Sequence, residues 1–81
     1  MSSEQEYESM LRLGDAARQA GISVQQLNYY LMVGVVIPSC ISQGGQRLFC
    51  PKAIKRIKMV SLLNQSGYTL RDIREIFIES R

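Results

Sequence analysis

The chain has 81 residues, 46% of them hydrophobic, and a formal net charge of +3, which suits one small globular domain without a deep substrate cavity. It contains no histidine, and Cys40 and Cys50 do not form a CxxC pair, so no metal site and no cofactor are expected and the cysteines are taken as ordinary small residues. Without a long apolar run or a secretory signal, the sequence predicts a cytoplasmic protein with no membrane contact.

Charge is distributed unevenly along the chain. Residues 1–10 contain three glutamates and no basic residue, and we expect them to form a disordered acidic tail. Residues 11–81 hold all ten lysines and arginines against four acidic residues, a net charge of about +6. This part is expected to be the folded domain, and its charge favours a polyanionic partner such as nucleic acid.

The residues around Gly21 predict two helices joined by a tight turn. Gly21 can end the first helix, near Ala20, in a left-handed conformation. Ser23 is a suitable N-cap for the second helix, and Gln26, three residues later, predicts a capping box. Helix, short turn with glycine and helix is the signature of a helix-turn-helix unit.

The second predicted helix, residues 24–33, has two distinct faces. Spacing of about 100° per residue places Val24, Leu27 and Leu31 on the core face, with Tyr30 at its edge. The opposite side carries amide and phenol groups, which can bind an adenine edge and phosphates respectively. A neutral surface helix that binds nothing is the alternative interpretation. The outward side chains are Gln25, Gln26 and Tyr29, flanked by Asn28 and Met32.

Residues 35–49 predict a small β-hairpin. Its first strand is expected at residues 35–37, before Pro38, and its turn at residues 43–45. The returning strand, residues 46–49, contains Arg47, which can reach a phosphate or a minor groove, or simply be solvated. A hairpin that follows a helix-turn-helix unit is a wing.

Two further helices are predicted after the wing. The third starts at Pro51, and its first turns carry a basic run that could contact phosphate or form an ordinary solvated face, with Lys52 and Lys55 as the candidates. Gly67 ends this helix and Thr69 caps the fourth. The apolar stripe of the fourth helix is predicted to be Leu70, Ile73, Ile76 and Phe77.

The predicted fold is therefore mainly α, a winged helix-turn-helix with the order helix, helix, β-hairpin wing, helix, helix over residues 11–81. The chain has no nucleophile with a base at usable spacing and no phosphate-binding glycine loop, so we expect no enzymatic activity.

Several of these segments resemble the DNA-binding domain of the mercury-resistance regulator (MerR) family. Residues 13–23 are similar to the family's opening, an alanine-rich helix followed by Gly-Val-Ser. Residues 27–30, Leu-Asn-Tyr-Tyr, are similar to its Leu-Arg-Tyr-Tyr, and residues 46–49 resemble its wing segment with arginine and an aromatic residue. Residues 67–70, Gly-Tyr-Thr-Leu, resemble the segment before its last helix.

The resemblance implies a bacterial transcription regulator with the second helix in the major groove and the wing on the flanking backbone. In this family such domains act as dimers on inverted repeats in promoters. Asn28 replaces a usual arginine and Leu31 a usual acid, and the dimerisation helix and effector-binding region would follow after Arg81. We therefore expect double-stranded DNA as partner and a possible homodimer through a segment absent from this chain.

The residues expected to contact DNA come from three of the predicted elements and the basic run. They are Arg18, Ser23, Gln25, Gln26, Asn28, Tyr29, Arg47, Lys52 and Lys55. Two other functions are compatible with the sequence. One is an architectural or recombination accessory protein similar to a phage excisionase, and the other is a winged-helix module that binds protein.

Overall fold

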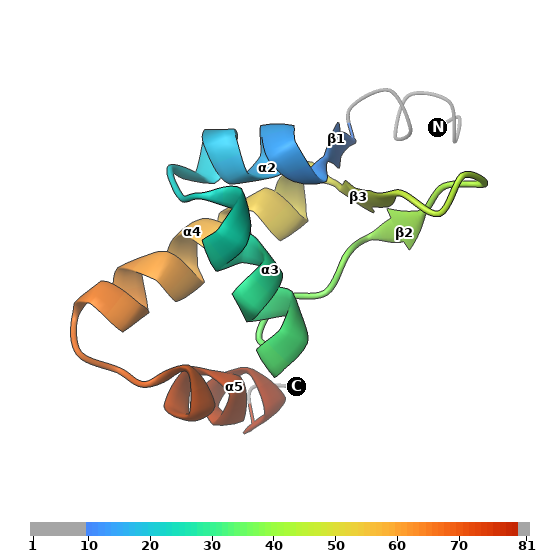
Figure 1. Ribbon diagram of the computed structural model, residues 1–81. Helices are drawn as coiled ribbons and strands as arrows, with labels where there is room; N and C mark the ends of the chain where they lie inside the picture. The colour runs from blue at the N-terminus through green and yellow to red at the C-terminus, as the bar shows by residue number, and fades with distance from the viewer. Residues whose placement is uncertain (1–9, 80–81) are drawn as a thin grey trace.

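The computed structural model describes residues 10–79, so the predicted acidic tail lies outside the described residues except for Met10. Within them the order predicted from sequence, two helices, a wing and two helices, is confirmed (Figure 1). One short strand precedes it. The elements are β1 (Leu11–Arg12), α2 (Leu13–Ala20), α3 (Val24–Val33), β2 (Cys40–Ile41), β3 (Arg47–Phe49), α4 (Pro51–Gln65) and α5 (Leu70–Glu79).

The turn between α2 and α3 forms as its residue types predict. Gly21 has φ 77°, and its N–H donates to the carbonyl of Arg18 at 3.1 Å. The Ser23 hydroxyl oxygen accepts from the backbone N–H of Gln26 at 3.0 Å and so caps α3. The predicted capping box is wrong, because the Gln26 side chain donates to the Tyr30 hydroxyl, one turn further along the helix, at 2.9 Å.

The wing belongs to a three-stranded antiparallel sheet in which β3 is central, in the order β1-β3-β2. Leu11 pairs with Phe49, and Cys40 pairs with Leu48 on the other side of β3. The wing turns where the Gly45 N–H donates to the carbonyl of Ser42 at 2.9 Å. The sheet therefore ties the start of the described chain to the wing.

The strand predicted at residues 35–37 is wrong, because the first strand of the wing is β2. The Val35 N–H donates to the carbonyl of Tyr30 at 3.2 Å, so this segment completes the end of α3. Val35 and Val36 are buried in the core. Their β-branched side chains are explained by burial, and Pro38, which has no N–H, stands before the strand.

The core lies between α4 and the helix-turn-helix unit, with α5 beneath (Figure 1). Tyr30 is buried in it, whereas Val24, expected on the core face, is 43% exposed because it lies in the first turn of α3, at the edge of the packing. Ile76 is also 42% exposed, since α5 packs against α3 and α4 along one narrow side only. The buried cluster is Ala16, Ala17, Leu27, Tyr30, Val35, Val36, Phe49, Ile54, Ile57, Val60 and Ile73.

The last helix is capped as predicted. The Thr69 hydroxyl oxygen accepts from the Asp72 N–H at 3.1 Å, and Gly67 has φ 109° after the end of α4. None of the helices described for residues 10–79 is long and apolar enough to cross a membrane.

Candidate nucleic-acid interface

The outer face of α3 carries an uncharged polar stripe. Gln25, Asn28, Tyr29 and Met32 follow one another at helical spacing, so they lie along one side of α3. All four are exposed, Tyr29 by 52% and Met32 by 77%. No residue of α3 is acidic or basic. These four residues, here called the α3 stripe, line a shallow surface hollow together with Ser23 and Gln26.

The three amides of α3 differ in how they are engaged. The Gln26 amide donates to the Tyr30 hydroxyl, which holds it against the helix. The Asn28 oxygen accepts a long hydrogen bond from Arg47 Nη1, at 3.4 Å. The Gln25 side chain is exposed and forms no hydrogen bond with another side chain or with the backbone among residues 10–79. Both the donor and the acceptor of its amide therefore face solvent.

The wing meets α3 through Arg47. This exposed residue starts β3, and its contact with Asn28 joins two residues that lie 19 positions apart in the chain. The α3 stripe and the wing therefore form one continuous surface. The groove between them is lined by Asn28, Leu31, Met32, Val36, Ile37, Pro38 and Arg47.

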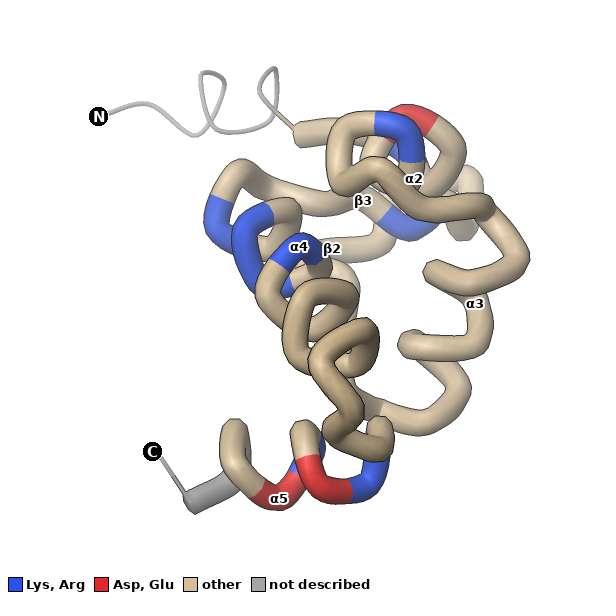
Figure 2. Tube along the Cα trace, turned by 90° about the vertical axis from the view of Figure 1, so that its left-hand side faces the viewer, with Lys and Arg blue, Asp and Glu red and all other residues tan. Residues whose placement is uncertain are grey.

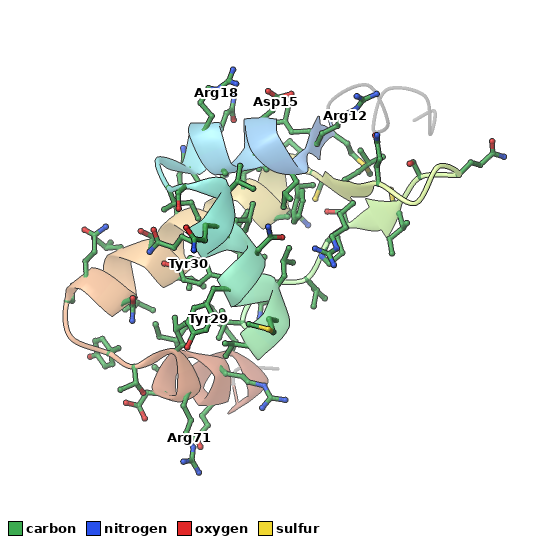
Figure 3. The ribbon with its side chains drawn as sticks, in the orientation of Figure 1. Arg12, Asp15, Arg18, Tyr29, Tyr30 and Arg71 are labelled. Carbon is green, nitrogen blue, oxygen red and sulfur yellow. The ribbon has the colours of Figure 1, made fainter. Side chains whose placement is uncertain are left out.

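Two further arginines extend from the helices on either side of α3. Figure 3 shows Arg18 on α2 at the top of the molecule and Arg71 on α5 at the bottom, with α3 between them. Arg18 forms an exposed ion pair with Asp15, at 3.7 Å, which is too weak to keep its guanidinium from a phosphate. Arg71 was not among the residues predicted from sequence. The sequence feature that could have identified Arg71 is a cation in the first turn of a helix, where acidic residues are favoured.

The basic run at the start of α4 lies elsewhere. Figure 2 shows the lysines and arginines of α4 on the left of the molecule and α3 on the right. Lys52 and Lys55 are exposed there. Lys52 borders a separate hollow with Ile37 and Pro38, which also line the groove between α3 and the wing. The guanidinium of Arg56 lies 4.2 Å from the centre of the Phe77 ring and its Nε donates to the Val35 carbonyl, which ties α4 to α5 and to the end of α3.

Both cysteines lie where the wing meets its neighbours, and both are free thiols. The Cys50 N–H donates to the Ser39 hydroxyl oxygen at 2.9 Å, and a side-chain hydrogen bond with Ser39 lowers the pKa of the Cys50 thiol. Cys40 Sγ lies 3.5 Å from Met10 Sδ. Among residues 10–79 no three His, Cys, Asp or Glu side chains gather to hold a metal ion.

Known proteins are similar to this chain in sequence, and solved structures are similar to it in fold. The family model for MerR HTH regulatory proteins matches residues 11–79. Nodulation protein NolA of Bradyrhizobium elkanii is 28% identical over 64 residues, 79% of this chain and 29% of that protein. The HTH-type transcriptional regulator ZntR of Escherichia coli K12 is 28% identical over 67 residues, 83% of this chain and 48% of that protein.

A solved structure extends the comparison to a DNA complex. HiNmlR, described as a MerR family regulator lacking the sensor domain and bound to promoter DNA, is 25% identical and has a TM-score of 0.75. The match covers 83% of this chain and 53% of that chain. The chain thus spans less than half of NolA and of ZntR, and about half of HiNmlR.

Proposed function

Because this chain belongs to the MerR family of helix-turn-helix regulatory proteins, we propose that it is the sequence-specific DNA-binding domain of a cytoplasmic transcription regulator. In this proposal α3 enters the major groove of double-stranded DNA and the wing lies on the flanking backbone. The observation that carries it is the exposed α3 stripe, joined by Arg47 to the wing. A helix fits the major groove, where amides can bind base edges.

Each side chain of the interface has a proposed role set by its chemistry. Gln25 and Asn28 face base edges, and Gln26 would join them by exchanging its bond to the Tyr30 hydroxyl for one to a base. The hydroxyls of Ser23 and Tyr29 bind phosphate oxygens. Arg18 and Arg47 neutralise phosphates on either side of α3. Lys52 and Lys55 would add phosphate contacts if the DNA path reaches the start of α4. No enzymatic step is assigned to any of them.

We further propose that tight binding requires two copies. One small module contacts few phosphates, so its affinity alone is low. A homodimer formed through a segment outside this chain would double the contacts, and the greater length of NolA and ZntR is compatible with such a segment.

A module that binds protein is the second candidate function. The groove between α3 and the wing exposes Met32 and Ile37, by 77% and 62%, beside Leu31 and Pro38. Exposed apolar side chains next to one another can mark a protein interface. Such a module would show no salt-dependent affinity for DNA, whereas the proposed DNA-binding domain would.

The test is the salt dependence of DNA binding. Binding would be measured by fluorescence anisotropy with a labelled mixed-sequence duplex, from about 50 to 200 mM salt. Affinity should fall steeply as salt rises, because binding releases counterions from the phosphates and added salt opposes their release. Arg47→Ala should weaken binding and reduce the salt slope by about one. Tyr29→Phe should weaken binding if the hydroxyl binds phosphate.

The charge-matched control is Lys58→Ala, which removes one exposed positive charge from α4, the helix whose lysines and arginines lie to the left of α3 in Figure 2. It should leave the slope nearly unchanged, because Lys58 is not among the residues proposed to contact phosphate and a charge that neutralises no phosphate releases no counterion. Absence of binding by the wild-type chain at low salt would contradict the proposed function. An equal effect of Lys58→Ala and Arg47→Ala would contradict the proposed surface.

A further inference from the structure

We infer that α3 selects A·T base pairs, with Gln25 binding an adenine and Met32 contacting a thymine methyl group. This inference rests on the proposed function, since it requires α3 to lie in the major groove. It goes further by naming the bases that are recognised and the two side chains that recognise them.

The first observation is that α3 has no cation. Guanine is most often read in the major groove by a bidentate arginine or lysine. No such side chain occurs between Val24 and Val33. Arg47, which extends from the wing, lies 3.4 Å from the oxygen of Asn28, a residue of the α3 stripe. The helix itself therefore lacks the usual means of selecting guanine.

The second observation is that Gln25 is the amide of α3 with both its atoms open. Gln26 donates to the Tyr30 hydroxyl, and the Asn28 oxygen accepts from Arg47. Gln25 has no partner among residues 10–79 and lies in the first turn of α3. In a recognition helix the N-terminal residues contact base edges, so Gln25 is well placed to do so. An amide with a free donor and a free acceptor matches the N7 and N6 atoms of adenine.

The third observation is the exposure of Met32. Its side chain is 77% exposed on the same stripe, seven residues after Gln25. At about 1.5 Å per residue Met32, in the last turn of α3, lies roughly 10 Å along the helix from Gln25, so it would meet the groove beyond the base pair beneath Gln25. A flexible apolar thioether can pack on the thymine methyl group, which projects into the major groove. The α3 stripe thus presents Gln25, which can bind adenine, and Met32, which can contact a thymine methyl group, to the same groove.

The experiment selects binding sites for the wild-type chain from a random duplex library at low salt and then edits the selected site. Replacing the adenine by 7-deazaadenine removes only the N7 acceptor, and replacing the thymine by uracil removes only the methyl group. We expect Gln25→Ala, which loses the bonds to both N7 and N6, to weaken binding on the order of tenfold, and 7-deazaadenine, which loses only the bond to N7, to weaken it less. In Gln25→Ala, 7-deazaadenine should cause no further loss.

The thymine contact is tested in the same way. Uracil should weaken binding by the wild type about fourfold, as expected for one buried methyl group, and should not weaken binding by Met32→Ala. Met59→Ala is the matched control, because Met59 is also exposed but lies on α4. It should keep the wild-type response to uracil.

The outcomes separate this inference from the function on which it rests. Selected sites with G·C pairs beneath α3, or binding without base preference, would overturn the inference and leave DNA binding intact. An unchanged adenine preference in Gln25→Ala would overturn the role of Gln25. Failure of the wild-type chain to bind any duplex at low salt would overturn both the inference and the proposed function.

Discussion

Asn28 illustrates how one residue changes the role of its neighbours. The family pattern has an arginine at this position of its Leu-Arg-Tyr-Tyr segment, where this chain has an asparagine. Asn28 instead accepts from Arg47, at 3.4 Å, so the positive charge at this part of the surface comes from the wing. The helix α3 is therefore uncharged, and the wing guanidinium lies beside it. A sequence comparison shows the missing charge on α3, and the structure shows that Asn28 contacts the arginine of the wing.

Single residues also set the ends of the helices, and these ends were well predicted. Ser23 and Thr69 act as N-caps through hydrogen bonds to backbone N–H groups three residues later. Caps are predictable because the interaction is local in sequence. The Gln26 side chain was not predictable in the same way, since two partners were available and the partly buried Tyr30 hydroxyl is the one it meets.

Two glycine substitutions should change stability in opposite directions. Gly21 has φ 77°, so Gly21→Ala should lower the free energy of unfolding by about 1–2 kcal/mol through backbone strain. Gly14 lies in α2 without positive φ and with open space around it, so Gly14→Ala should raise it by up to about 1 kcal/mol. Urea unfolding measures both. Equal stability of the two variants would contradict the account of the turn.

At the scale of elements, the helices and the returning strand of the wing were predictable from sequence, whereas β1 and the position of β2 were not. The helices have periodic apolar residues, caps and glycine ends, all signals within one segment. Strand β1 has only two residues and pairs with β3. Leu11 and its partner Phe49 lie 38 residues apart in the chain, so no local pattern reveals β1. Residues 35–37 have high β propensity because Val and Ile are β-branched. Here Val35 and Val36 fill the core, and propensity alone cannot distinguish burial of this kind from strand pairing.

The two faces of α3 should respond differently to truncation. Leu27 is fully buried, so Leu27→Ala should destabilise the fold by roughly 2–5 kcal/mol. Met32 is 77% exposed on the same helix, so Met32→Ala should change stability by no more than about 0.5 kcal/mol. Thermal or urea unfolding gives both values. A large loss of stability in Met32→Ala would mean that this side chain packs against the fold and is not available to DNA.

At the scale of the whole molecule, charge and polarity divide between two sides. The uncharged α3 stripe occupies one side, and the lysines and arginines of α4 occupy another (Figure 2). Sequence reasoning grouped Lys52 and Lys55 with the α3 residues because the chain order of elements does not show which way each helix faces. Their contact with DNA stays a prediction that depends on how far the duplex bends or extends around the domain.

Removing both lysines tests that prediction. If Lys52 and Lys55 each contact a phosphate, the double variant Lys52→Ala/Lys55→Ala should lose about two units of the salt slope of DNA binding. The comparison is the pair Arg18→Ala/Arg47→Ala, which should lose a similar amount if those arginines bind phosphate. An unchanged slope for the lysine pair together with a loss for the arginine pair would restrict the interface to α2, α3 and the wing.

The location of the interface is the central claim, and backbone amide NMR tests it most directly. Spectra of the chain with and without a duplex would be compared residue by residue at low salt. Shifts should concentrate along the α3 stripe, from Gln25 to Met32, and around Arg47, while the exposed side of α4 near Met59 and Leu62 stays unchanged. Shifts confined to α4, with α3 unaffected, would contradict the account.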